Sequence, residues 1–296
     1  MAFKIAYGAG HFRYTSGNKI PSELDAAETR EWVLNDRVAR YFAQAAAQYE
    51  DVELLRTDDI TGQIDVSLGE RCRKANAFGA DFCLSIHHNA GANLTKAGGI
   101  EAYSYPGSKM GAAYRDAIYE QCIAADGLRG NRATPKNTAG FYVLRYTVAP
   151  CVLMEYGYMD SKSDAPVILQ EAYAEKMAYA TMAAIARMAG LAGKQAAEYS
   201  METFRKELQT ALDATEETLF SKTVTLSVEK NYVHPAVRPV QKRLYALGYT
   251  QVGEADGIAG PKFRSAVIAF QSDNDCWRDG IITAGNKTWR KLLGME

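Results

Sequence analysis

Histidine, paired cysteines and long apolar runs are all scarce in this chain. Its 296 residues include four histidines and five cysteines, and no two cysteines are spaced as Cys-x-x-Cys. An odd number of cysteines without that spacing predicts reduced, buried thiols in a protein made in the cytoplasm. No apolar run is long enough for a transmembrane helix, which needs roughly 20 residues. We therefore expect no membrane partner.

Charge excess and a secretion signal are also lacking. The chain has 34 Lys and Arg against 35 Asp and Glu, so its balanced charge gives no electrostatic reason to expect a nucleic-acid partner. Residues 1–8 lack the apolar core of roughly 7 to 15 residues that marks a Sec signal peptide. With 47% apolar and 23% charged residues, the composition is that of an ordinary soluble protein.

Short apolar segments alternate with amphipathic ones as far as residue 192. The apolar segments predict strands at residues 3–7, 52–55, 82–86, 99–104, 141–144 and 151–155. The amphipathic segments predict helices at residues 28–49, 67–79, 109–126 and 164–190. This order predicts an α/β fold with an open twisted sheet flanked by helices. An alanine-rich stretch closes this first domain, which we assign to residues 1–193.

Two further segments follow the first domain. Residues 194–223 lack glycine and proline, and they predict a linker helix with one narrow apolar seam formed by Phe204, Leu208, Leu212 and Leu219. We expect this seam to pack on its own chain or on a partner, such as the same helix of a second subunit in a homodimer. Residues 224–296 contain a near-repeat in which an Asp-Gly turn, at Asp256 and again at Asp279, precedes a short helix. We expect a small, mainly helical module there.

Side chains that bind metals fall at the ends of predicted strands. His11 follows the first strand, His87 follows the third, and Glu155 ends the last. Ligand sites in open α/β sheets form beyond the carboxyl ends of the strands, so we expect these side chains at one edge of the sheet. Two imidazoles and a carboxylate are a typical metal-site composition. The spacing does not choose between His87 and the adjacent His88, which point to opposite faces of the strand.

A fourth candidate comes from the helix predicted at residues 28–49. At about 100° per residue, Glu31 lies roughly 40° from the centre of the apolar stripe of this helix, whereas Glu28 lies roughly 100° away. Glu31 is therefore predicted to point inward. A buried carboxylate is costly without a cation partner, and a metal bound by two histidines would be that cation.

Each of these residues alone has an ordinary interpretation. A histidine at a strand end is more often a hydrogen-bonded structural residue, Glu31 could serve the first-turn amides of its helix, and Glu155 could pair with an arginine. The combination favours a metal site, because three strand ends and one helix face would otherwise have to coincide. Zinc is the expected metal, since two imidazoles and one carboxylate leave a fourth tetrahedral position for water, as in catalytic zinc sites.

The same residues fall within motifs of a known family. The first 190 residues resemble the zinc-dependent N-acetylmuramoyl-L-alanine amidases of the amidase-3 type, found in bacterial autolysins and phage endolysins. The motifs appear in family order as Gly10-His11, Glu31 with Asn35, Ser67 to Arg71, Ser85 to Asn89, Gly99 to Glu101 and Pro150 to Tyr158. The tail resembles a peptidoglycan-binding type 1 module through Val240-Gln241, Leu247-Gly248-Tyr249, Asp256-Gly257-Ile258, Phe270-Gln271 and Thr288-Trp289.

The resemblance implies a role for each candidate residue. His11, Glu31 and His87 would bind one zinc ion (Zn2+) per catalytic domain, with His87 rather than His88 as ligand, and Glu155 would be the catalytic acid/base. The implied reaction is hydrolysis, by zinc-activated water, of the amide between N-acetylmuramic acid and L-alanine in bacterial peptidoglycan. Peptidoglycan is then the expected partner of the C-terminal module. Without a Sec signal, the protein would reach the wall after release by a holin or by lysis.

The chain also departs from the family pattern. Residues 12–17 replace the usual glycines and an Asp-Pro-Gly turn, His88 replaces a small residue, and Phe263 in the tail replaces a threonine. Two alternative functions stay open: a zinc peptidase that cuts within the stem peptide, and a catalytically silent adaptor that binds the wall. The peptidase would release a different amino terminus, and the filled ligand and acid/base positions argue against the adaptor.

Overall fold

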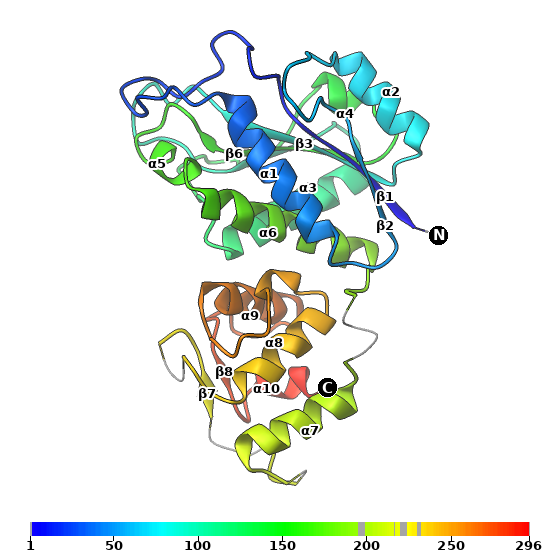
Figure 1. The fold of residues 1–296 in the computed structure, drawn as a ribbon, viewed down its shortest axis with the longest axis vertical. Coiled ribbons are helices and arrows are strands. Elements are labelled where there is room, and N and C mark those ends of the chain that lie inside the picture. Colours follow the sequence, from blue (N-terminus) through cyan, green and yellow to red (C-terminus); the bar gives the residue numbers. More distant parts are fainter. Residues whose placement is uncertain (1, 195–198, 216, 220–223, 230–231, 296) are drawn as a thin grey trace. The chain divides into compact units, whose positions relative to one another are not determined.

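The computed structural model describes residues 2–194, 199–215, 217–219, 224–229 and 232–295. These residues form two compact units, whose elements are labelled in Figure 1. The first unit comprises the chain up to Ala47 together with Asp51–Ala189, and the second comprises Gln48–Glu50 together with the chain from Gly190. All five cysteines are buried, and none forms a disulfide. None of the described helices is both long and apolar enough to cross a bilayer.

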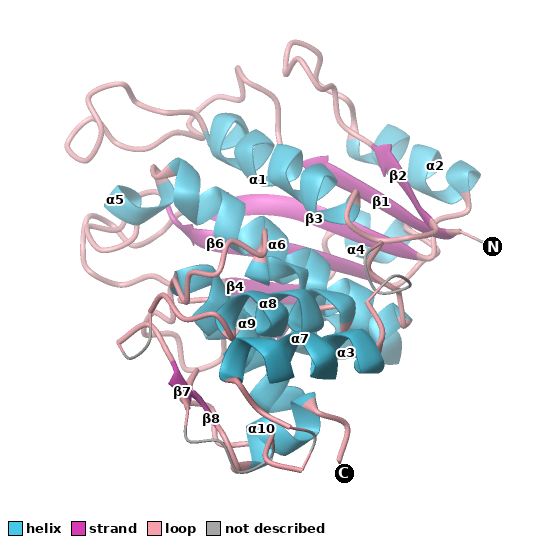
Figure 2. Ribbon diagram, turned by 60° about the horizontal axis from the view of Figure 1, so that its bottom comes forward, coloured by secondary structure: helices cyan, strands magenta, loops and turns pink. Residues whose placement is uncertain are grey.

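A six-stranded sheet forms the centre of the first unit. Its strands are β1 (Phe3–Ala9), β2 (Val52–Arg56), β3 (Phe82–Asn89), β4 (Glu101–Ser104), β5 (Lys136–Thr138) and β6 (Cys151–Tyr158). They lie in the order β2-β1-β3-β6-β4-β5, and Figure 2 shows β2, β1, β3, β6 and β4 side by side. The strands β2, β1, β3 and β6 run parallel, whereas β4 is antiparallel to β6 and parallel to β5. The predicted α/β class with an open sheet is confirmed.

Helices cover both faces of this sheet (Figure 1). They are α1 (Glu31–Ala46), α2 (Leu68–Phe78), α3 (Lys109–Ala124), α4 (Tyr142–Tyr146), α5 (Ala165–Ile168) and α6 (Glu171–Ala189). One layer is formed by α6 packed against α1 and α3. On the other face α2 packs against α4, and their side chains join a core cluster with Cys83 of β3 and Leu153 of β6. Because helices bury both faces of the sheet, the strands β1, β3 and β6 are nearly continuous apolar runs.

The prediction of a strand at residues 141–144 is wrong, because this segment is helical. Its last three residues begin α4, and the edge strand β5 lies a few residues earlier. A run of four apolar residues does not distinguish a short helix from a buried strand. The helical turn buries Val143 and Leu144 against the core and leaves Phe141 and Tyr142 each 44% exposed.

Two other predicted boundaries also differ in the structure. The helix predicted at residues 164–190 is divided into α5 and α6. The strands β3 and β6 extend past their predicted ends to Asn89 and Tyr158, because their parallel pairing continues through His87 and Glu155. His87 therefore projects from the last part of β3 instead of following it, and Glu155 lies within β6 instead of ending it.

The second unit is small and mainly helical, as predicted. Its elements are α7 (Met201–Leu212), β7 (Thr225–Leu226), α8 (Val237–Ala246), the 3-10 turn η1 (Thr250–Val252), α9 (Pro261–Asp273), β8 (Ile282–Thr283) and α10 (Lys287–Leu292). The strands β7 and β8 form an antiparallel ribbon.

The segment predicted as a linker helix belongs to the core of this second unit. The helix α7 is shorter than predicted; it ends at Leu212, and the capping residue Asp213 that follows has a φ of 49°. Residues 195–198, 216 and 220–223 of the predicted linker lie outside the described residues. Phe204, Leu208 and Leu219 are fully buried in the same hydrophobic cluster as the helices that follow. The apolar seam thus packs on its own chain, and the structure gives no support to a homodimer through it.

Two equivalent hydrogen-bond networks explain the near-repeat in the second unit. Gln241 of α8 donates to Asp256 Oδ1 at 2.8 Å and accepts a bond from the next glycine amide at 2.8 Å. Gln271 of α9 donates to Asp279 Oδ1 at 2.8 Å and accepts a bond from the next glycine amide at 2.9 Å. In each copy a buried glutamine side chain fixes an Asp-Gly turn, so the repeated sequence encodes a repeated local structure.

Candidate metal centre and catalytic cavity

Three of the predicted site residues converge at one edge of the sheet in the first unit. The ligand atoms of His11, Glu31 and His87 all lie within 4.8 Å of one another. Glu31 Oε2 is 3.2 Å from His11 Nε2, and Glu31 Oε1 is 3.2 Å from His87 Nδ1. The two imidazole rings meet edge to face with centroids 5.2 Å apart. Across the part of the chain that the structure describes, this is the one group of three or more such side chains that could hold a metal ion.

The chain that follows β1 is shaped to bring His11 to this position. A Cβ atom added at Gly10 would lie 2.1 Å from Cε1 of His87, so no larger residue fits there. His11 itself has a φ of 63°, in the left-handed region that residues other than glycine rarely adopt. Arg71 of α2 holds this turn by donating to the carbonyl oxygens of Ala9 at 2.5 Å and His11 at 2.7 Å.

Glu31 is a buried carboxylate at the first position of α1, where it is 2% exposed. The side-chain amide of Asn18 donates to its Oε2 at 2.7 Å, and that of Asn35 donates to its Oε1 at 3.1 Å. Burial by itself raises the pKa of Glu31, but the hydrogen bond and charge of His87 and the charge of His11 lower it to about 2. Glu31 points inward, as the helix periodicity predicts, whereas no sequence signal marks Asn18.

His87 and His88 project from opposite faces of β3, and only His87 reaches the cluster. Nδ1 of His88 is 2.8 Å from Oδ1 of Asn35. The Asn35 amide nitrogen donates to Gly10 O and to Glu31, so its oxygen is the acceptor and His88 donates from Nδ1. Burial lowers the pKa of His88 to about 3, and the ring is neutral at physiological pH. His88 therefore supports Asn35 and, through it, Glu31.

Glu155 lies on β6 directly between His87 of β3 and Glu101 of β4 in the strand register. It stands outside the three-residue cluster but lines the same cavity as His11 and His87. Part of the residue faces this cavity, yet its Oε2 atom is buried and has no hydrogen-bond partner among the described residues. Burial raises the pKa of Glu155 well above its ordinary value, and the charges of Glu31 and Glu101 add to the rise. An unsatisfied carboxyl with a raised pKa is typical of groups that transfer protons.

A second carboxylate beside Glu155, that of Glu101, has hydrogen-bond partners on both of its oxygens. Glu101 accepts one bond from the hydroxyl of Tyr103 at 2.6 Å and another from the hydroxyl of Tyr158. Arg132 Nε lies 3.3 Å from Glu101, and its guanidinium stacks over the Tyr158 ring at 4.6 Å from the centroid. Glu101 is visible in the sequence only as part of a motif, and nothing there marks Arg132 as its partner.

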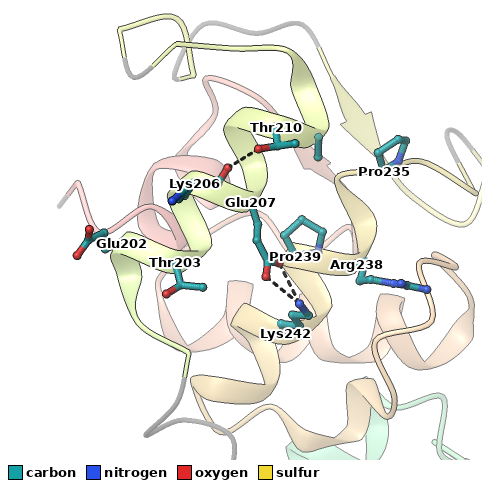
Figure 3. Close-up of a pocket in the computed structure, with 10 residues that line it drawn as sticks. Glu202, Thr203, Lys206, Glu207, Thr210, Pro235, Arg238, Pro239 and Lys242 are labelled. Atoms are coloured by element: carbon teal, nitrogen blue, oxygen red, sulfur yellow. Dashed lines mark hydrogen bonds and ion pairs between the residues drawn. The ribbon is translucent and has the colours of Figure 1, made fainter.

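A cavity of about 490 Å³ is lined by His11 and His87 of the cluster and by Glu155. Its exposed lining includes three large apolar or aromatic side chains, Leu68 at 51% exposed and Phe141 and Tyr142 at 44% each, together with the polar Asp65 and Ser67. A larger cavity of about 880 Å³ lies in the second unit, between α7 and α8 (Figure 3). No histidine or cysteine lines that second cavity, whereas the smaller one is lined by two residues of the candidate metal cluster, His11 and His87.

Two family models match the chain. A model of the amidase-3 family, described as N-acetylmuramoyl-L-alanine amidase, matches residues 5–187. A model of peptidoglycan-binding domains matches residues 233–292. The first match covers more than half of the chain and includes the candidate metal ligands His11, Glu31 and His87 as well as Glu155.

Curated relatives match about half of the chain. The N-acetylmuramoyl-L-alanine amidase CwlM of Bacillus licheniformis is 37% identical over 160 residues, which are 52% of this chain and 58% of that protein. The endolysin of Bacillus phage SPP1 is 32% identical over 153 residues, 48% of this chain and 51% of that protein. The chain thus spans about half the length of the curated relatives that it matches.

Solved structures share the fold of the first unit. The catalytic domain of CwlV, an N-acetylmuramoyl-L-alanine amidase from Bacillus (Paenibacillus) polymyxa, superposes with a TM-score of 0.56 at 21% identity, covering 64% of this chain and 98% of that one. An N-acetylmuramoyl-L-alanine amidase from Clostridium difficile gives a TM-score of 0.56 at 22% identity, covering 64% and 97%. At these identities the likeness shows the fold alone.

Proposed function

Since the chain belongs to the amidase-3 family of N-acetylmuramoyl-L-alanine amidases, we propose that it hydrolyses the amide between N-acetylmuramic acid and L-alanine in bacterial peptidoglycan. The observation that carries this proposal is one cavity lined by His11 and His87 of the cluster and by Glu155, whose Oε2 atom has no hydrogen-bond partner among the described residues. Amide hydrolysis needs a nucleophile that is active at neutral pH and a group that moves protons. A metal ion held by the cluster would activate the nucleophile, and the carboxyl of Glu155 would move the protons.

The cluster suits a zinc ion. Two imidazoles and a carboxylate are preferred zinc ligands, and three protein ligands leave a position for water or substrate. The buried carboxylate of Glu31 also requires a cation, because among the described residues it forms ion pairs only with the two imidazoles, and burial lowers the pKa of His11. We infer that His11, Glu31 and His87 hold one zinc ion in this domain. When bound, zinc supplies a water activated at neutral pH and a Lewis acid for the scissile carbonyl.

Glu155 is the acid/base of this proposal. Its Oε2 atom makes no bond to another described residue, so it is available to accept a proton from the attacking water. The same carboxyl then returns the proton to the leaving amine of L-alanine. The raised pKa favours the uptake of the proton from the attacking water, because a carboxylate of higher pKa is a stronger base, and the proton then stays on Glu155 until the amine leaves. General acid-base catalysis of this kind typically contributes about 10² to 10⁴-fold to the rate.

Apart from the candidate catalytic groups, the residues that line the cavity include Arg71, which holds a backbone turn, and exposed side chains that are open to solvent. Arg71 donates to three backbone carbonyl oxygens, so its guanidinium is occupied in holding the turn before the cluster. Leu68, Phe141 and Tyr142 form the open apolar side. Sugar and peptide groups on either side of the scissile amide would lie along this side, which offers apolar area next to the reacting groups.

The second unit would hold the enzyme on its polymeric substrate. Its match to peptidoglycan-binding domains supports this role, and tethering a catalytic domain raises its effective concentration at the wall. In this proposal the protein acts on the wall after its release from the cell by a holin or by lysis.

Mass spectrometry of purified sacculi digested with the zinc-loaded full chain tests the proposed function. We expect stem peptides that begin with L-alanine, and glycan strands that carry free lactyl carboxylates. New amino termini at another residue would instead identify a peptidase. Sacculi that bind the protein without releasing products would identify a wall-binding adaptor.

A further inference from the structure

The groove between α7 and α8 is a second concave site of this chain. Its α8 wall lies within the region matched by the peptidoglycan-binding model, residues 233–292, whereas its α7 wall precedes that region. The helix α7 is nevertheless fixed in place, because Phe204 and Leu208 are fully buried and Arg205 donates to Leu293 O at 2.6 Å. One wall of the groove is therefore formed by a helix, α7, that lies outside the region matched by the peptidoglycan-binding model.

The floor of the groove is cross-linked by charged groups. Lys242 of α8 donates to both carboxylate oxygens of Glu207 on α7, at 2.8 and 3.1 Å, and Figure 3 shows this pair between the two helices. The hydroxyl of Tyr199 also donates to Glu207, at 2.9 Å. These bonds satisfy Glu207 and hold the two walls at a fixed spacing.

Charges with spare bonding capacity remain on both walls. Lys206 of α7 is exposed, and its ammonium has no side-chain or backbone partner among the described residues. Arg238 of α8 is exposed and makes one hydrogen bond, to Asp256 O at 3.3 Å, which leaves most of its five donors free. Glu202 adds an exposed carboxylate at the start of α7, likewise without a partner in the described part of the chain. The groove thus presents two cations and one anion for a ligand.

The chemistry of the lining favours a peptide over a sugar. Five of the ten lining residues are charged, and none has an aromatic ring or a side-chain amide. Sugar rings are typically held by aromatic faces and amide hydrogen bonds, whereas carboxylates are held by Arg and Lys. The remaining lining includes Pro235, Pro239 and Ala211, which offer small apolar surfaces suited to alanine methyl groups.

We propose that this groove binds the stem peptide of peptidoglycan. Lys206 and Arg238 would pair with its carboxylates, and Glu202 would pair with an ammonium group of the peptide. The inference rests on the proposed function, because that function makes the wall polymer the partner of the second unit. It adds the part of the polymer that is recognised and the residues that recognise it.

Isothermal titration of the full chain with a synthetic stem peptide (L-alanine, D-glutamate, a diamino acid, D-alanine) tests this proposal. The double variant Lys206→Glu, Arg238→Glu should raise the Kd by about tenfold or more, since both carboxylate partners become repulsive. The control Arg278→Glu reverses an exposed charge of the same unit outside the groove, and it should leave the Kd within about twofold. Binding by the wild-type chain should also weaken as salt is raised.

Two results would overturn the proposal: an unchanged Kd in the double variant, or glycan strands stripped of peptide that compete as well as the peptide does. Turnover of a small soluble muropeptide should be the same in all three proteins, because the catalytic cavity lies in the first unit. This turnover is measured separately from binding. A failure of the proposed amidase activity is therefore distinguishable from a failure of the groove.

Discussion

Glu101 and Glu155 lie directly opposite each other on β4 and β6; both carboxylate oxygens of Glu101 accept hydrogen bonds, whereas Oε2 of Glu155 has no partner among the described residues. The two tyrosine hydroxyls and Arg132 surround Glu101 with hydrogen-bond donors, and the charge of Glu101 adds to the rise in the pKa of Glu155. In the proposed mechanism these two neighbouring carboxyls have different roles, Glu101 as a fixed charge and Glu155 as the proton carrier.

Replacing Glu101 with Gln should shift the pH dependence of catalysis. Removing the negative charge beside Glu155 lowers the pKa of Glu155, so the acidic limb of the kcat/KM profile should move to lower pH. Tyr103→Phe is the matched control, because it removes one hydrogen bond and keeps the charge of Glu101. An acidic limb that stays in place in Glu101→Gln, or moves to higher pH, would show that the two carboxyls are not coupled.

Asn35→Ala should weaken metal binding without removing a ligand. Asn35 is fully buried and donates to Glu31 and to Gly10 O, so its loss frees the carboxylate that the cluster depends on. Loss of such a supporting residue typically costs about 10 to 100-fold in metal affinity. Asn76→Ala is the control, since Asn76 bonds Tyr146 O away from the cluster. Equal zinc affinities in the two variants, measured by competition with a chelator, would contradict this role.

His88→Asn should flatten the dependence of stability on pH. The unfolded chain protonates His88 near its ordinary pKa of 6.5, whereas the folded protein does so only near 3. Between these values the unfolded state binds more protons, so the free energy of unfolding falls as pH falls, by up to about 1.4 kcal/mol per pH unit. Asparagine keeps a donor toward Asn35 but does not titrate. Denaturant titrations of metal-free protein should therefore show a smaller slope in the variant, and equal slopes would mean that His88 is charged when folded.

Residues 1–193 alone should fold and retain zinc-dependent hydrolysis of small muropeptides, while binding to intact walls drops. Every residue of the cluster and its supports lies before residue 160. The sheet of the first unit also has its own buried core. Circular dichroism, turnover and sacculus pull-down of the truncated protein check this division. A truncated protein that is unfolded, or that binds walls as tightly as the full chain, would refute it.

The sequence predicts the sheet and the convergence at its edge because both follow from simple periodicities. The sequence places His11 and His87 at strand ends and Glu31 on the inner face of a helix. These positions are enough to predict that the three side chains converge. Strand alternation places His87 and His88 on opposite faces, although it does not say which face holds the cluster.

Periodic patterns in the sequence do not predict features that depend on tertiary contacts. Asn18 reaches Glu31 from an irregular loop, and no periodicity governs where a loop side chain points. The helical turn at Phe141 and Tyr142 follows from packing against α2, which a four-residue run cannot reveal. The seam of α7 shows apolar spacing in the sequence, but its partner is decided by the core that it meets, here its own chain.

The most direct test of the proposed mechanism is the zinc content of Glu155→Gln, measured by atomic absorption on the same sample as its turnover. We predict full zinc and a kcat lowered by about 10² or more, because the carboxyl moves protons and does not hold the metal. Glu31→Gln, a matched change of a proposed ligand, should lose zinc instead. A Glu155→Gln protein with full zinc and wild-type turnover would exclude Glu155 as the acid/base, and one stripped of zinc would make it a ligand.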